Sequence, residues 1–94
     1  MHAHAEGSNT IALGPQSHAG GRLSEANNYY AFAHGHHAVA SGSASVAMGY
    51  ETEAVGSGAT ALGKNTEATG EGSLAAGNST MAGNKGAIAL GTGS

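Results

Sequence analysis

The chain has no cysteine, tryptophan or aspartate, and only one proline and one phenylalanine among its 94 residues. Without cysteine it cannot be held together by disulfides, and without aspartate it cannot repeat the turns of a calcium-binding β-roll. Large apolar residues are too scarce for an ordinary globular core. The formal net charge of -3 argues against nucleic acid as a partner, because nucleic acid selects a basic surface. No apolar run approaches the roughly 20 residues of a membrane-spanning helix, and no signal peptide is visible.

Glycine and alanine dominate what remains, and they follow a strict seven-residue repeat. From Ala3 onward the chain divides into thirteen units without a gap, and residues 3–94 are expected to form one domain. Met1 and His2 are expected to be the start of an excised fragment. Position three is alanine in every unit, position one is serine, threonine or alanine, and position five is glycine in all but two units. Stacked copies of such a repeat share a core that one copy could not bury alone.

Each unit predicts a short strand of four or five residues followed by a tight turn. A coiled coil would need two large apolar residues per unit and could not carry glycine in nearly all of them. Alternation along a strand places positions one, three and five on one face, which we predict to be the interior of a narrow β-roll. The interior alanines are Ala12, Ala19, Ala33, Ala40, Ala47, Ala54, Ala61, Ala68, Ala75, Ala82 and Ala89.

Position five is predicted to lie in the turns, because glycine and asparagine tolerate a left-handed backbone. The predicted turn residues are Gly14, Gly35, Gly42, Gly49, Gly56, Gly63, Gly70, Gly77, Asn84 and Gly91.

Positions two and four form the outer face and carry a slower rhythm. They are apolar in alternate units and more polar in the units between, so the true period is two units, a 14-residue coil of two strands. One sheet therefore has an apolar outer stripe that a single chain would leave exposed. We expect obligate association of chains through this stripe. Its residues are Phe32, Val46, Met48, Leu62, Leu74, Ala76, Ile88 and Leu90.

The rhythm slips near the N-terminus, where Ile11 and Leu13 are one unit out of phase with Phe32. Two explanations are open. Either residues 20–30 contain a bulged or looped insertion, or the first coils pack differently.

Several stretches resemble the head repeats of YadA-like trimeric autotransporter adhesins, whose motif is close to N-S-V-A-I-G-x-x-S. They are NTIALGPQS (9–17), SASVAMGYET (43–52), GATALGKNT (58–66) and GAIALGTGS (86–94), while the units SEANNYY (24–30) and AFAHGHH (31–37) depart from the motif. The resemblance implies an all-β, left-handed parallel β-roll that forms a homotrimer in the head of a fibre on a Gram-negative outer membrane. That hand is an exception to the usual right-handed crossover.

The resemblance also implies a function. Such a head attaches bacteria to host matrix protein such as collagen or fibronectin, to host cells or to other bacteria, with no enzymatic activity and no membrane contact by this segment. The alternative is a structural or receptor-binding segment of a phage tail fibre.

His34, His36 and His37 are the first candidates for a chemical site, because zinc and nickel favour imidazole. His34 faces the predicted seam, where three copies could form a ring on the trimer axis. His36 and His37 are expected to be turn residues. No second shell is evident, so we expect no metal and no cofactor. We also expect no hydrolytic triad, because the repeat explains nearly every serine and so thin a roll offers no pocket.

The exposed contacts are predicted to include aromatic and acidic side chains. Tyr29, Tyr30 and Tyr50 fall at positions six and seven, hence at predicted turns, where they could either contact a partner or cap the seam. Glu53 and Glu67 complete this set. An ice-binding surface would need an outward threonine ladder, but Thr52, Thr66 and Thr80 occupy position one and are predicted to face inward.

Overall fold

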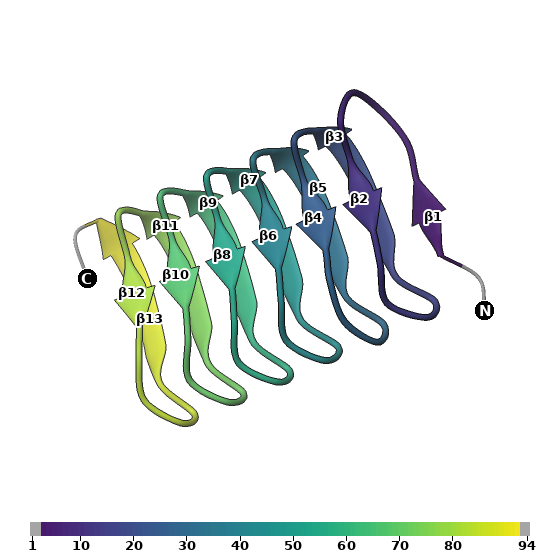
Figure 1. The fold of residues 1–94 in the computed structure, drawn as a ribbon. Coiled ribbons are helices and arrows are strands. Elements are labelled where there is room, and N and C mark those ends of the chain that lie inside the picture. The colour runs from purple at the N-terminus through teal and green to yellow at the C-terminus, as the bar shows by residue number, and fades with distance from the viewer. Residues whose placement is uncertain (1–2, 93–94) are drawn as a thin grey trace.

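The computed structural model describes residues 3–92 as an all-β roll of stacked coils (Figure 1). Met1 and His2, expected to start a fragment, lie outside the described residues, as do Gly93 and Ser94. The strands of these residues form two parallel sheets, which we call the long-strand sheet and the short-strand sheet. The described part of the chain includes no helix of the length and apolarity that a membrane crossing requires.

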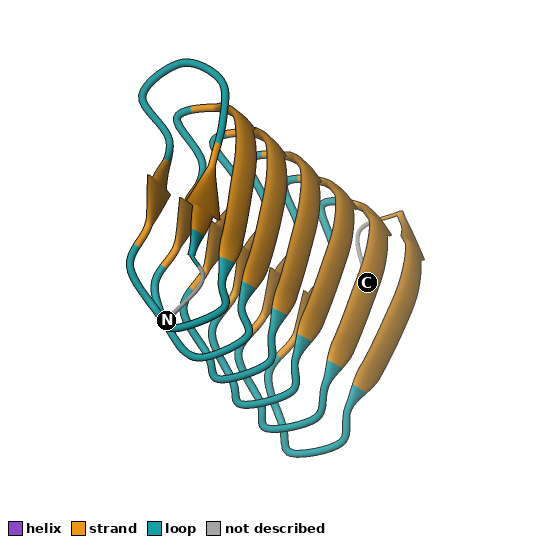
Figure 2. Cartoon of the chain, turned by 90° about the vertical axis from the view of Figure 1, so that its right-hand side faces the viewer, coloured by secondary structure: helices purple, strands orange, loops and turns teal. Residues whose placement is uncertain are grey.

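The long-strand sheet consists of β1 (His4–Ala5), β3 (His18–Arg22), β5 (Phe32–His36), β7 (Val46–Tyr50), β9 (Thr60–Lys64), β11 (Leu74–Asn78) and β13 (Ile88–Thr92). The short-strand sheet consists of β2 (Ile11–Ala12), β4 (Glu25–Ala26), β6 (Val39–Ala40), β8 (Glu53–Ala54), β10 (Glu67–Ala68) and β12 (Met81–Ala82). Figure 2 shows the coils stacked along one axis, with successive strands of each sheet side by side.

Every strand pairs with the strand that lies two units further along the chain. Leu74, for example, pairs with Thr60 on one side and Ile88 on the other. The predicted coil of two units with one strand in each sheet is therefore confirmed. The Cα atoms extend over 34 Å along the longest axis but only 10 Å along the shortest, so the roll is thin.

Alanine at position three fills the interior of the roll. The residues at this position from Ala19 to Ala82 are at most 1% exposed, and Ala12 and Ala89 near the two ends are partly buried. The side chains of position one lie beside them, where Ser45 and Thr66 are fully buried. Alanine suits this place because it buries a methyl group without losing side-chain rotamer entropy.

The short strands end in β-turns that begin at position five. In each turn an N–H three residues later donates to the carbonyl oxygen of position five, as from Ser45 to Gly42 at 3.2 Å. The third residue of each turn has a positive φ near +60° to +70°, which is the type II pattern. Five of the predicted turn residues begin these turns: Gly14, Gly42, Gly56, Gly70 and Asn84.

The turn prediction is wrong for the other half of the set. Gly35, Gly49, Gly63, Gly77 and Gly91 lie inside five-residue strands of the long-strand sheet. Their φ angles lie between +109° and +132°, and a Cβ atom on Gly63 would collide with the carbonyl oxygen of Gly77 in the next coil. Glycine is needed there because the backbones of adjacent coils approach closely, while the corner follows at position seven, for example at Glu51 with φ +56°.

The N-terminal coils keep the same register as the others. Ile11 pairs with Glu25, Glu25 pairs with Val39, and His18 pairs with Phe32, so residues 20–30 contain no insertion or looped bulge. Ile11 belongs to the short-strand sheet and Phe32 to the long-strand sheet. The slip in rhythm therefore arises because the apolar side chains lie on the short-strand sheet at Ile11 and on the long-strand sheet from Phe32 onward.

A glycine inside a long strand and a glycine at the third residue of a turn should tolerate a side chain differently. Gly63→Ala should lower the free energy of unfolding by about 3 kcal/mol or more, because the new methyl group meets backbone and the φ of +114° disfavours any side chain. Gly72→Ala is the matched control. Its φ of +68° is the same region that Ala44 occupies, and a Cβ there meets nothing within 4 Å, so it should cost only about 1 kcal/mol. Urea unfolding measures the free energy of unfolding of both variants. Equal losses of this free energy would contradict the claim that close backbone approach requires glycine at residue 63.

Candidate functional site

The outer face of the long-strand sheet carries two aligned columns of side chains that are apolar apart from Thr60 and His34. Position two contributes Phe32, Val46, Thr60, Leu74 and Ile88, and position four contributes His34, Met48, Leu62, Ala76 and Leu90. All eight residues predicted for the interface lie in these columns. Met48 is 41%, Leu90 59% and Ile88 68% exposed. One chain therefore presents a continuous apolar strip, of the kind that marks an interaction surface.

The same face is aromatic and polar at its N-terminal end. The rings of His4, His18 and Phe32 stack in series, with centroids 4.8 and 4.9 Å apart. His34 lies over Gly20, where an added Cβ would meet its ring, and its centroid is 6.4 Å from that of His18. Glu6 accepts a 2.8 Å hydrogen bond from His4, and this bond and the nearby imidazoles lower the pKa of the exposed Glu6 carboxyl.

The histidines of the described residues do not assemble a metal site within the single chain. Among residues 3–92, no group of three or more histidine and glutamate side chains is arranged to hold a metal ion. His34 instead contacts aromatic neighbours, and its ring lies within 17° of parallel to that of Phe32. A ring of His34 side chains would need three chains.

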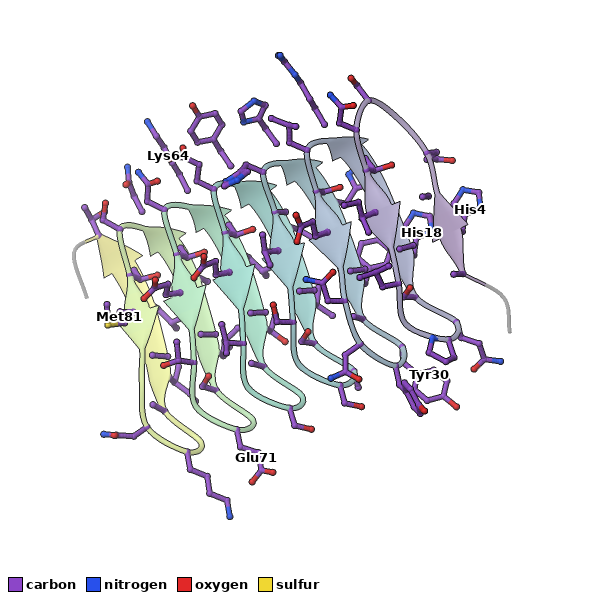
Figure 3. All side chains as sticks on the ribbon, in the orientation of Figure 1. His4, His18, Tyr30, Lys64, Glu71 and Met81 are labelled. Carbon is purple, nitrogen blue, oxygen red and sulfur yellow. The ribbon has the colours of Figure 1, made fainter. Side chains whose placement is uncertain are left out.

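A further column runs along the edge where the long strands end, at position six. It begins with Arg22, His36, Tyr50 and Lys64, which pair in successive strands, and it continues to Asn78 and Thr92. We call the first four residues the position-six column. His36 and Tyr50 were predicted to lie in turns, but they are the last residues of β5 and β7, because the long strands continue past position five. Figure 3 shows Lys64 at this edge with its side chain directed away from the roll. His37 occupies the corner after β5, with φ +59°.

Arg22 and Lys64 occupy a variable position of the repeat, and only the period of two units could have identified them as neighbours. That period places position six of alternate units in one column. The sequence thus contained the signal, but the composition of each unit by itself did not.

The outer face of the short-strand sheet carries an acidic groove. Glu53 and Glu67 are register neighbours on β8 and β10, and His37, Glu51 and Met81 are among the other residues that line the groove. Partial burial raises the pKa of Glu53, and the charge and hydrogen bond of Glu67 raise it further, while the charge of His37 lowers it. Two carboxylates at one strand spacing, about 4.8 Å, repel each other when both are ionised.

The remaining candidate contacts lie at the opposite edge of the roll. Tyr29 and Tyr30 occupy the β-turn after β4 and are 57% and 61% exposed, and Figure 3 shows Tyr30 at this edge. The tyrosines therefore do not form one patch with Tyr50. Thr52, Thr66 and Thr80 are at most 1% exposed, so they offer no outward threonine ladder.

Comparison with protein families gives one result that covers most of the chain. The family model described as the YadA head domain repeat, which spans two copies of the repeat, matches residues 4–22, 26–52, 40–66, 54–80 and 68–94. Successive overlapping matches are offset by one coil of the roll. A search of curated proteins found no match.

The pairing of Glu53 with Glu67 predicts that the contribution of Glu53 to the free energy of unfolding falls as the pH rises. Because the pKa of Glu53 in the fold lies above its ordinary value of 4.5, the folded protein holds this proton more tightly than the unfolded chain does. Its contribution is present below about pH 4.5 and is lost as the pH rises through the raised pKa. Glu53→Gln should therefore match the parent near pH 4 and exceed it in stability at pH 7.

Urea unfolding at the two pH values measures this difference. Glu71→Gln is the control, because Glu71 is exposed and paired with Lys85 at 3.4 Å, so its loss should slightly destabilise the protein at pH 7. A Glu53→Gln protein that is less stable than the parent at pH 7 would contradict the repulsive pair.

Proposed function

The chain belongs to the YadA head domain repeat family, and from that membership we propose that it is an adhesion module in the head of a trimeric autotransporter. It would attach bacteria to host matrix protein such as collagen or fibronectin, to host cells or to other bacteria. The family is of the adhesin type, which supports a position in a fibre at the cell surface. We further propose that this fibre is anchored in a bacterial outer membrane.

The observation that carries the proposal is the apolar strip on the long-strand sheet. The interior face of the same strands is lined with alanine, so the largest aliphatic side chains of each coil lie on the outer face, as Leu74 and Leu90 do. Three chains that face one another through this sheet would bury these side chains in a shared core. Each buried aliphatic side chain stabilises such an assembly by about 1.5–3 kcal/mol.

A parallel homotrimer also suits adhesion. Every coil would then recur three times around the axis, and the coils repeat along it. Repeated weak contacts combine by avidity, because binding of one raises the effective concentration of the next. We therefore propose that binding is distributed over the outer edges and turns, with no catalysis, no nucleic acid and no membrane contact by this segment.

A charge in the strip tests the trimer. Leu74→Glu should convert the trimer to monomers, because it would place three carboxylates at the seam without partners, at a cost of about 3 kcal/mol or more each. Sedimentation equilibrium measures the mass. Val55→Glu is the control, since Val55 is 44% exposed directly after β8 of the short-strand sheet and its change should leave the trimer intact.

A parent protein that sediments as a monomer, or a Leu74→Glu protein that remains an equally stable trimer, would show that the strip is not the seam.

Adhesion itself is tested with the intact trimer on beads. Beads that carry the parent trimer should bind to collagen, to fibronectin or to cultured host cells, or should clump with each other. In solution, the monomeric Leu74→Glu protein should bind the same immobilised targets far more weakly than the soluble parent trimer, because the avidity of three linked chains is lost. A parent trimer that binds none of these targets would contradict the adhesive role.

A further inference from the structure

The position-six column lies apart from the apolar strip and has its own chemistry. Arg22, His36, Tyr50 and Lys64 occupy successive strands β3, β5, β7 and β9 in unbroken register. Neighbouring parallel strands lie about 4.8 Å apart, so the column spans about 14 Å from Arg22 to Lys64. It therefore offers two cations at its ends and two rings between them.

The rings in the middle of the column are held in place by each other. The centroids of His36 and Tyr50 are 4.9 Å apart and the rings lie within 10° of parallel. Lys64 Nζ lies 5.9 Å from the centroid of Tyr50, within reach of a cation–π attraction. Tyr50 remains 45% exposed. A ligand thus meets an ordered aromatic surface with a cation beside it.

Among the described residues, no carboxylate forms an ion pair with the charges of the column. Arg22 and Lys64 are two of the three basic residues in the chain. The ion pairs within residues 3–92 join His4 to Glu6 and Lys85 to Glu71. Glu51 follows Tyr50 in sequence but lines the acidic groove together with Glu53. Positive charge is therefore concentrated on one edge of a chain that is acidic as a whole.

We infer that this column binds an anionic polysaccharide that carries sulfate or carboxylate groups, and this inference rests on the proposed adhesive role. The apolar face of a sugar ring can pack on the face of Tyr50, while the anionic groups pair with Arg22 and Lys64. Two cations on either side of two rings suit a chain whose charged groups are spaced by sugar rings. The net charge of -3 and the adjacent acidic groove disfavour a nucleic acid, whose charge is denser. In a trimer, three columns would act together.

The test uses the intact trimer and immobilised heparan sulfate. The parent should bind, and the binding should weaken as salt is raised. The double variant Arg22→Gln/Lys64→Gln should bind about tenfold more weakly or worse, because two charge-assisted contacts are lost. Lys85→Gln is the matched control. It removes one positive charge from the opposite edge, as Lys64→Gln alone does from the column, and it should stay within about twofold of the parent, as expected for a residue that makes no such contact.

The aromatic part is tested separately at Tyr50. Tyr50→Ala should weaken binding several-fold, and Tyr50→Phe should retain it, because stacking needs the ring and not the hydroxyl group. Tyr29→Ala, which removes from the turn edge a ring that is more exposed than that of Tyr50, should have no effect.

Several outcomes would overturn the inference. The inference would fall if the parent trimer bound desulfated polysaccharide as tightly as heparan sulfate, or if the double variant bound heparan sulfate as tightly as the parent. It would also fall if the double variant bound duplex DNA more weakly than the parent but bound heparan sulfate equally well. A double variant that no longer sediments as a trimer would assign the column to the seam. A parent trimer that binds host cells or matrix protein but not heparan sulfate would refute this inference alone. A parent that is monomeric and binds nothing would refute the proposed function as well.

Discussion

The two sheets of this roll lie so close together that alanine fills position three along the whole interior. The Cα atoms extend over only 10 Å in the thinnest direction, and the buried side chains are alanine, serine and threonine. An interior of this kind buries little apolar area per residue, so it offsets only part of the backbone entropy lost on folding. The hydrogen bonds and the outer contacts must supply the rest.

The narrow interior determines where the large apolar residues lie. Leu62, Leu74, Ile88 and Leu90 have no place between the sheets and stand on the outer face of the long strands. Folding of one chain thus creates an apolar surface instead of covering one. The association proposed for this family member follows from the same constraint as its alanines, because it would cover the large side chains that the interior has no room for.

Much of this architecture could be predicted from the sequence, because it depends on residue type. Constant alanine predicts the interior, and the rhythm of two units predicts the coil and places the apolar residues on one sheet. The strand lengths were predicted only in part, because the four or five residues expected of every strand hold for β7 but not for β6, which has two. Gly42 begins a turn and Gly49 lies within a strand, yet both are glycine at position five. A Cβ atom on either residue would collide with the backbone of the next coil, so close approach does not separate them. They differ in backbone conformation, since Gly49 has a φ of +123° and Gly42 has no positive φ, and the residue type at position five does not reveal this difference.

The edge column was missed, and the corners were predicted only in part. Position seven adopts a left-handed backbone with residues as different as Leu23, Tyr30 and His37, and of these Tyr30 and His37 were expected in turns. Asparagine and glycine, which favour this backbone, also occupy position seven, as at Asn65 and Gly72, so the local sequence signals the corner in some units and not in others. The edge column of Arg22 and Lys64 joins residues three coils apart, and it becomes visible only when the chain is aligned coil by coil.

That alignment also explains how one scaffold can carry different binding surfaces. Interior positions cannot vary without collision, whereas a side chain at position two, four or six changes one rung of one outer column. The long-strand sheet uses this freedom along its length, with His18 and Phe32 near one end and Leu74 and Ile88 near the other. Neighbouring rungs lie only one strand spacing apart, about 4.8 Å, so each substitution is felt by the rungs on either side. Specificity in such a roll is therefore a property of columns, and a single unit does not contain it.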